Sequence, residues 1–187
     1  MCDTKITHKI IFLGGVHGVG KTFLGKELCV KFGFSHYSAS ELIKEYKGID
    51  FPKDKRIKDI GSNQDVLVGA IQSLVPNDSH ILLDGHFCLI NARGGVSDIP
   101  SSTFIELSPE AMIVLHDSPQ EIHRRLLTRG KDNHDIGFIE YFQSCELLHS
   151  EVIAGRIDRP LLKHNASGDQ AAIHDFIEKI ILRRGDL

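Results

Sequence analysis

The sequence predicts an α/β fold in which helices cover both faces of a parallel sheet, and two observations support this prediction. Short apolar runs alternate along the chain with longer segments in which apolar residues recur at helical spacing. Each apolar run ends near a charged or glycine-rich turn, as strands do at one edge of a parallel sheet. We therefore expect five parallel strands, in a three-layer arrangement, within one domain that spans residues 1–187.

The first predicted strand, Lys9–Gly14, leads directly into a glycine-rich segment that matches the pattern G-x-x-x-x-G-K-[ST]. Glycines let successive backbone N–H groups point at one phosphate, through dihedral angles that a Cβ would obstruct. A helix follows and ends at Gly33, and its N-terminus adds partial positive charge. The segment is predicted to be a phosphate-binding loop (P-loop) that consists of Gly15, Val16, His17, Gly18, Val19, Gly20, Lys21 and Thr22.

Three side chains are predicted to carry the nucleotide chemistry of this loop. Lys21 would supply a solvent-facing charge to the β- and γ-phosphates of ATP, and the Thr22 hydroxyl is placed to bind Mg²⁺. Asp84 ends the apolar run that begins at residue 80, which brings it to the same edge of the sheet. The sequence therefore predicts ATP and Mg²⁺ as ligands, with Thr22 and Asp84 as the metal ligands.

Between these two strands the chain is predicted to form a short strand over residues 34–37 and two helices. Ser38 and Ser40 precede the apolar residues of the first helix, and serine hydroxyls at such positions commonly cap a helix. Arg56 lies in a polar, lysine-rich stretch, a pattern that is also typical of a solvated face. The second helix, residues 63–74, is amphipathic and closes at Pro76.

The second half of the chain continues the alternation of strands and helices. Residues 91–100 are predicted to form a loop, and two further strands are expected over residues 111–116 and 160–163. Ser118 begins a helix that has proline at its first position. The segments that follow are a polar break and two helices, over residues 130–135, 138–153 and 170–182.

Composition narrows the functional classes. A net charge of −3 argues against a broad nucleic-acid surface, so local groups must hold any anionic ligand. The four cysteines lack C-x-x-C spacing, which predicts reduced thiols in a cytoplasmic protein, without a zinc site. No apolar run is long enough to cross a bilayer. Lys5 and Lys9 precede a short apolar run, as in a secretory signal peptide, but no small-residue cleavage site follows.

The order of these motifs resembles that of the nucleoside monophosphate kinases, and most of all the archaeal-type adenylate kinases. The P-loop is the most specific part of the likeness, and Asp84-Gly85-His86 stands where that family has Asp-Thr-His. The other matching runs are Ile99-Pro100, Leu107-Ser108-Pro109-Glu110, Glu121-Ile122-His123-Arg124-Arg125-Leu126, Gln143 and Leu162-Lys163-His164-Asn165.

The resemblance implies roles for several further residues. Arg125 would lie against the base or phosphates of ATP, and Arg129, on the same helix face, would reach the phosphates from a short lid over residues 130–137. The helix dipole alone also favours cations at this position. Gly168 would let the backbone approach adenine. The phosphate acceptor would be bound by helices within residues 38–78 and by the side chains of Ser38, Ser40, Arg56 and His86.

Two functions are consistent with these residues. The first is Mg-ATP-dependent phosphoryl transfer to a small molecule such as a nucleoside monophosphate, with Lys21, Asp84, Arg125 and Arg129 as the catalytic residues. Just beyond Arg129, however, the chain has one lysine and several acidic or polar residues where related enzymes carry further arginines. Fewer fixed donors there would weaken stabilisation of the transferring group. The second function is therefore a nucleotide-binding switch or slow ATPase that acts through a protein partner.

Overall fold

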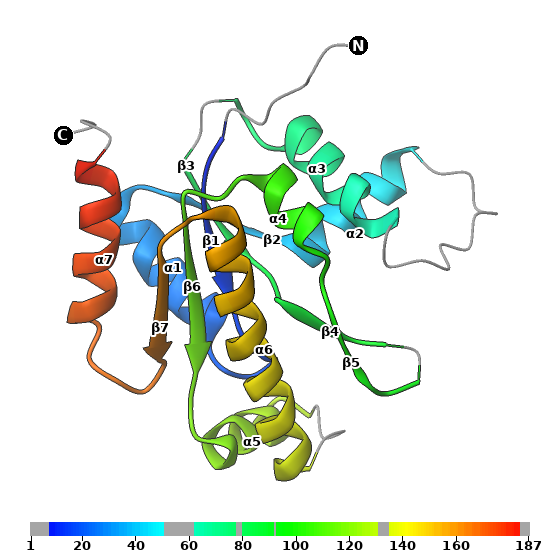
Figure 1. Cartoon of the computed structure of the whole chain (residues 1–187), viewed down its shortest axis with the longest axis vertical. Coiled ribbons are helices and arrows are strands. Elements are labelled where there is room, and N and C mark those ends of the chain that lie inside the picture. Colours follow the sequence, from blue (N-terminus) through cyan, green and yellow to red (C-terminus); the bar gives the residue numbers. More distant parts are fainter. Residues whose placement is uncertain (1–7, 51–61, 78–79, 92, 131–134, 184–187) are drawn as a thin grey trace.

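A computed structural model describes residues 8–50, 62–77, 80–91, 93–130 and 135–183, and its centre is a parallel sheet (Figure 1). In this part of the chain the sheet has five strands in the order β2-β3-β1-β6-β7, and every pair is parallel. The predicted fold class is confirmed. The strands are β1 (Lys9–Gly14), β2 (Ser35–Ser38), β3 (His80–Asp84), β6 (Ala111–His116) and β7 (Leu161–Asn165).

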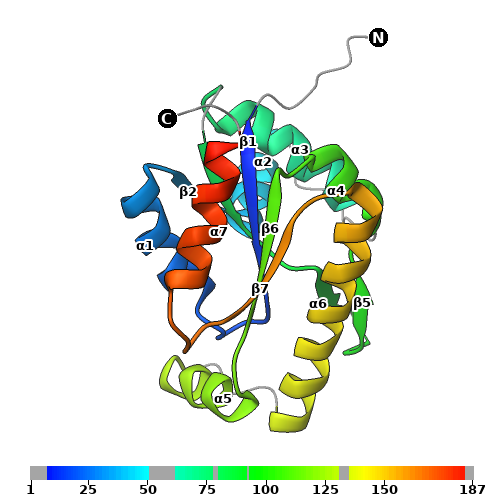
Figure 2. The ribbon, with the colours of Figure 1, turned by 60° about the vertical axis from the view of Figure 1, so that its left-hand side comes forward.

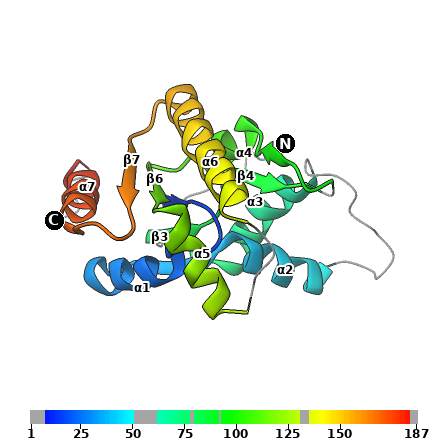
Figure 3. The same cartoon turned by 90° about the horizontal axis from the view of Figure 1, so that it is seen from below.

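Helices cover both faces of this sheet, which gives three layers (Figures 2 and 3). The helices of the described residues are α1 (Lys21–Phe32), α2 (Ala39–Asp50), α3 (Ser62–Leu74), α4 (Ser101–Leu107), α5 (Pro119–Thr128), α6 (Ile136–Ile157) and α7 (Ala171–Leu182), of which α5 lies beyond the ends of the strands. None of the helices described here is long and apolar enough to span a membrane.

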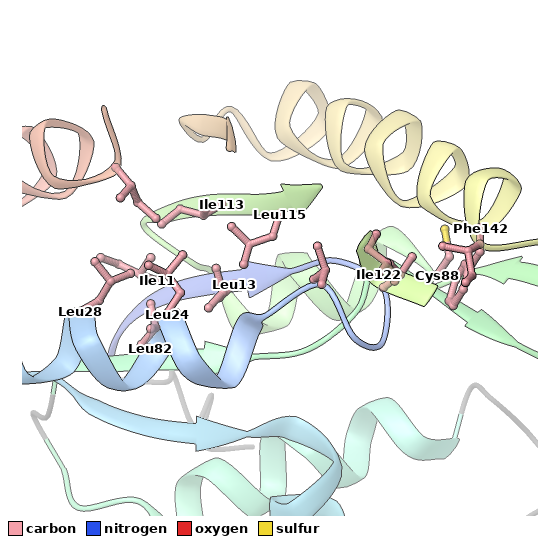
Figure 4. Packing of buried hydrophobic residues seen from close by; sticks show 14 of the residues in the cluster. Ile11, Leu13, Leu24, Leu28, Leu82, Cys88, Ile113, Leu115, Ile122 and Phe142 are labelled. Carbon is pink, nitrogen blue, oxygen red and sulfur yellow. The ribbon is translucent and has the colours of Figure 1, made fainter. Parts of the chain in front are cut away.

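The two cores follow from the alternation of side chains along the strands. Ile11 and Leu13 of β1 pack on one face with residues of α1 and α7, among them Leu24 and Leu28 (Figure 4). Their neighbours in β1 point to the other face and pack with residues of α2, α3, α4 and the C-terminal part of α6. Central strands buried on both faces read as continuous apolar runs, which is why β1, β3 and β6 are recognisable in the sequence.

One predicted loop contains a strand. Residues 91–100, expected to be a loop, include the strand β5 (Val96–Asp98), which pairs antiparallel with β4 (Cys88–Ile90). The Asn91 side chain stabilises the turn between them, because its oxygen accepts the N–H groups of Arg93 and Gly95 at 3.0 and 3.1 Å. Strands of three residues are too short to show an alternating pattern, so this hairpin leaves little trace in the sequence.

One predicted helix start is confirmed, and a second helix has a cap that was not predicted. Ser118 precedes α5, and its hydroxyl accepts the backbone N–H of Glu121 at 3.2 Å. Asp135 caps α6 in the same way, because it accepts the N–H of Phe138 at 2.7 Å. The observed helix α6 runs from Ile136 to Ile157 and is therefore longer at both ends than the helix predicted over residues 138–153.

Three phenylalanine rings form the centre of the second core. The centroid of Phe12 lies 5.0 Å from that of Phe87 and 5.2 Å from that of Phe104, both in edge-on geometry. These rings also occupy the space beside two glycines at strand ends. A Cβ on Gly14 would lie 2.3 Å from the Phe87 ring, and a Cβ on Gly85 would lie 2.8 Å from the Phe12 ring. The absence of a side chain at Gly14 and Gly85 therefore leaves the space that the aromatic rings occupy.

Phe104→Ala should destabilise the protein strongly, because it removes a ring that is 1 % exposed and leaves a cavity between two other aromatic side chains. We expect a loss of roughly 3–5 kcal/mol in the free energy of unfolding, measured by urea denaturation followed by circular dichroism. Ile105→Ala is the matched control, since the neighbouring side chain is 58 % exposed and should cost little. Equal losses for the two variants would contradict this account of the core.

Candidate nucleotide-binding site

The P-loop connects β1 to α1 and adopts backbone angles that require glycine. Gly15, Gly18 and Gly20 have φ angles of 136°, 83° and 115°. Space is also restricted at two of them, because a Cβ on Gly15 would lie 2.7 Å from the Leu115 carbonyl oxygen and one on Gly18 would lie 2.8 Å from the Leu126 side chain. The loop is thus held between β6 and α5 in a conformation that presents its backbone to a ligand.

Lys21 is the first residue of α1, and its side chain is buried rather than solvent-facing. Only 8 % of the residue is exposed, and Nζ donates hydrogen bonds to the carbonyl oxygens of Gly15 at 2.6 Å and Val16 at 3.2 Å. Burial lowers the pKa of Lys21 below its ordinary value, although the charges of Asp84 and Glu146 act in the opposite direction. The expectation of a solvent-facing charge is therefore wrong, since the loop wraps around the ammonium group.

Asp84 and Thr22 meet at the edge of the sheet, as the sequence predicts for a metal site. Parallel pairing of β1 with β3 places Leu13 beside Asp84, so the aspartate lies next to the start of the P-loop. The Thr22 hydroxyl donates to Asp84 Oδ2 at 3.2 Å, and Lys21 Nζ lies 3.9 Å from Oδ1. A hydroxyl and a carboxylate oxygen this close are a fitting donor set for Mg²⁺, which keeps several waters and uses few protein ligands.

A cavity of about 270 Å³ opens at this edge and collects most of the predicted site residues. Ser38 and Ser40 reach it from the junction of β2 and α2, with their hydroxyl oxygens 3.0 Å apart. Arg129 reaches it from the C-terminal end of α5. The residues that line it are Val16, His17, Gly18, Gly20, Lys21, Thr22, Ser38, Ser40, Asp84 and Arg129.

Arg125 does not line this cavity but ties three segments together beside it. Its guanidinium donates to the Val19 carbonyl at 3.0 Å, to Asp117 Oδ2 at 2.8 Å and to the Ser167 hydroxyl at 3.0 Å. Ser167 also donates to Asp117 at 2.6 Å. Asp117 follows β6, and sequence reasoning gave it no role, although its place at the end of a buried strand was the available clue. The arginine thereby connects the P-loop to α5 and to the turn after β7.

A second buried acid was also missed. Glu146, in the middle of α6, is 1 % exposed and accepts the backbone N–H of Phe87 at 2.8 Å. Its other oxygen lies 2.8 Å from Nδ1 of His86, whose ring is 4.4 Å from that of His17 in the P-loop. His86, predicted to contact the acceptor, therefore lies behind the P-loop against α6. Glu146 is one of three glutamates in α6, and the sequence does not distinguish it from Glu140 and Glu151, which are exposed.

Burial dominates the protonation of this pair. Desolvation raises the pKa of Glu146 to about 7, while hydrogen bonds from the backbone and the charge of Lys21 limit the rise. Desolvation, followed by the charge of Lys21, lowers the pKa of His86 to about 3. The imidazole is therefore neutral at physiological pH, and the carboxyl group is the member of the pair that titrates there.

The remaining predicted residues are not brought into the cavity by the described structure. Gly168 lies in the turn after β7, where its N–H donates to the Asn165 carbonyl at 2.9 Å. Arg56 and residues 131–134 of the predicted lid lie outside the described residues. No cluster of three or more acidic, histidine or cysteine side chains suited to a metal occurs in the described ranges.

The P-loop and its neighbouring carboxylate are features of nucleotide-binding domains. In agreement with them, a family model described as an AAA domain matches residues 14–140. The chain belongs to this family of P-loop domains, whose matched segment begins at the end of β1 and includes the P-loop, Asp84 and α5.

The individual proteins that the chain is similar to share about a quarter of its residues. The chain is 26% identical to adenylate kinase 1 of Schistosoma mansoni over 202 aligned positions, which cover 99% of both chains. It is 27% identical to UMP-CMP kinase 1 of Oryza sativa subsp. japonica over 144 residues, which cover 72% of this chain but only 56% of that kinase. A gluconokinase structure from Sinorhizobium meliloti 1021 superposes with a TM-score of 0.50 at 14% identity, covering 97% of this chain and 95% of the other, and shows the fold alone.

Glu146→Gln should remove a pH-dependent loss of stability. The pKa of the Glu146 carboxyl group is about 7 in the folded protein and 4.5 ordinarily, so the folded protein binds the carboxyl proton more tightly than the unfolded chain does. The protonated carboxyl group therefore stabilises the fold below about pH 4.5, and this stabilisation is lost as the pH rises to about 7. At 1.4 kcal/mol per pKa unit, the loss is about 3 kcal/mol.

The measurement is urea denaturation of both proteins at several pH values. Relative to the wild type, the Glu146→Gln variant should become more stable as the pH rises from about 5 to about 8, because only the wild type has a carboxyl group that ionises at this position. His86 acts in the opposite direction, since its lowered pKa makes stability rise with pH in the acidic range, so the difference between the two proteins is the informative quantity. A pH-independent difference would contradict the assignment.

Proposed function

We propose that this protein is a Mg-ATP-dependent phosphotransferase for a small molecule, of the nucleoside monophosphate kinase type. The observation that carries the proposal is that one cavity collects the P-loop, Asp84, Ser38, Ser40 and Arg129. A phosphate-binding loop alone would suit any nucleotide-binding protein. Polar side chains from β2 and α2 on the other side of the same cavity provide a place for an acceptor beside the nucleotide phosphates. Similarity to adenylate and UMP-CMP kinases supports this class.

Each group has a distinct task in this proposal. The P-loop amides and the α1 N-terminus would hold the phosphates, and Lys21 is already fixed by two carbonyl groups for a contact with them. Thr22 and Asp84 would hold Mg²⁺, which when bound offsets phosphate charge. Ser38 and Ser40 would orient the acceptor, and Arg129 would contact the group in transfer. These tasks are positioning and charge neutralisation, which is what phosphoryl transfer chiefly requires.

An alternative is a nucleotide-binding switch or slow ATPase that acts through a protein partner. The observation that favours it is the engagement of Arg125 with Asp117, Ser167 and the Val19 carbonyl, outside the residues that line the cavity. An arginine held in this way is a poor candidate for direct contact with a transferring phosphoryl group. It would instead couple a change in the conformation of the P-loop to movements of α5 and of the turn after β7.

ADP release from ATP and Mg²⁺ in the presence of a panel of acceptors separates the two functions. A kinase should release ADP in proportion to an added acceptor, with equimolar phosphorylated product, whereas a switch should release it at a rate independent of every acceptor. The panel should contain AMP, CMP, UMP and sugar acids such as gluconate. Lys21→Met, checked for folding, is the inactive control, because methionine has a side chain of similar length but no charge. Acceptor-independent release across the panel would reject the kinase.

Arg129→Ala should lower kcat by about 10²-fold or more, because a preorganised charge beside the reacting phosphates is lost. Arg129→Lys should recover only part of the rate, since an ammonium group cannot make a bidentate contact. Arg124→Ala is the control, because this side chain lies one turn earlier, is 64 % exposed and pairs with Glu121. If the Arg124 and Arg129 variants lose activity equally, Arg129 has no special role in the cavity.

A further inference from the structure

A series of contacts runs from the interior of α6 to the P-loop. Glu146 is 1 % exposed, and its Oε1 atom lies 2.8 Å from Nδ1 of His86. The centroid of the His86 ring lies 4.4 Å from that of His17, with an angle of 59° between the ring planes. His17 is exposed and lines the nucleotide cavity. A buried carboxyl group is therefore connected to the cavity through one imidazole.

The helix α6 holds the His86 ring by two contacts. Besides the hydrogen bond with Glu146, the ring stacks on Phe142, with a centroid distance of 6.2 Å and an angle of 12° between the planes. Phe142 and Glu146 are four residues apart, so they share one side of the helix, and both are buried. Rotation of the His86 ring would therefore disturb its contacts with α6 and with the P-loop together.

The carboxyl group of Glu146 is itself fixed by the backbone between β3 and β4. Its Oε2 atom accepts the N–H of Phe87 at 2.8 Å, and the backbone of Cys88 also donates to the carboxyl group. These bonds set the direction in which Oε1 faces His86. The orientation of the imidazole is thus determined by an acid that is held in place on its other side.

Ionisation of Glu146 is unfavourable for the fold alone. Desolvation raises the pKa of this group to about 7, so a carboxylate at this position reduces the stability of the folded protein. Acids that are perturbed in this way are common at functional sites. The contacts of Glu146 indicate which function to expect, because it supports the histidine that packs against the P-loop.

We propose that Glu146 is a positioning residue for nucleotide binding, which acts through His86 to hold His17 of the P-loop at the cavity. Held in this way, the His17 imidazole lies in the cavity that Gly20 and Lys21 also line, where it can contact a phosphate oxygen of the nucleotide. The P-loop pattern leaves position 17 open to any residue, so this contact is not part of the general motif. The inference rests on nucleotide binding, as in the proposed function, but not on transfer to an acceptor.

Two variants at position 146 separate the charge from the hydrogen bond. Glu146→Gln removes the charge, but its amide can still accept the N–H of Phe87 and donate to Nδ1 of His86. Glu146→Leu removes the charge and the hydrogen bond at similar size. The negative charge of Glu146 acts on Lys21, and beside a phosphate site it disfavours an anionic ligand. Loss of the charge alone should therefore not weaken nucleotide binding, whereas loss of the hydrogen bond should.

Calorimetric titration of the full chain with Mg-ATP and with ADP measures this difference. Glu146→Leu should raise Kd about 10-fold, the size of effect that outer partners of metal-bound histidines have at their sites. Glu146→Gln should bind at least as tightly as the wild type. Glu140→Leu is the matched control, since Glu140 is an exposed glutamate of the same helix, and should leave Kd unchanged. Circular dichroism checks that each variant is folded.

His86→Ala provides a second test that does not depend on the folding of Glu146→Leu. Only 14 % of the His86 side chain is exposed, but the alanine variant buries no new group and removes the link between α6 and His17. It should weaken nucleotide binding to about the same extent as Glu146→Leu. A folded His86→Ala variant with wild-type affinity overturns the inference.

A double-variant cycle with His17→Ala tests the route. Glu146→Leu should lose most of its effect on Kd in the His17→Ala background, because the side chain that it positions is absent. An equal effect in both backgrounds means that Glu146 supports the fold rather than His17, and it overturns the inference. So does a Glu146→Leu variant with wild-type affinity, or a Glu146→Gln variant as weak as Glu146→Leu. A wild type that binds no nucleotide overturns the proposed function together with the inference.

Discussion

The parallel pairing of β1 with β3 is the constraint on which the candidate site depends. It brings Asp84 level with Leu13, and hence beside the first turn of the P-loop, although the two segments are far apart in sequence. Because β1 is central, the loop after it is also bordered by β6 and α5, whose atoms leave no room for a Cβ on Gly15 or Gly18. The loop conformation and the position of the carboxylate therefore follow from one arrangement of strands.

Buried charged side chains next to the P-loop also affect the candidate site. Lys21, Asp84 and Glu146 are all buried near one another, and each of the two acids opposes the effect of burial on the Lys21 ammonium. His86 stays neutral between them, since burial and the lysine charge both disfavour its protonation. The buried side of the site is thus close to charge balance without a ligand, which limits the energetic cost of leaving these groups out of water.

The fold and the front of the site could be predicted from the sequence because their causes are local. Continuous apolar runs mark buried strands, and the P-loop pattern fixes the position of Lys21 and Thr22 relative to β1. The hairpin of β4 and β5 could not be predicted, since its strands are only three residues each. Glu146 and Asp117 were missed for another reason. Their roles depend on contacts with His86, Arg125 and Gln143 that are made across the fold. The position of Asp117 after a buried strand was the one clue in the sequence, whereas nothing around Glu146 distinguishes it from an exposed acid.

The contact between Phe12 and Gly85 has a consequence for how chains of this kind can diverge. A Cβ at position 85 would overlap the Phe12 ring at 2.8 Å, so the Asp-Thr-His pattern of the adenylate kinases cannot simply be substituted here. A side chain at position 85 would have to displace the Phe12 ring, which is itself packed against Phe87 and Phe104. We therefore expect the effects of substitutions at positions 12 and 85 to be coupled rather than additive.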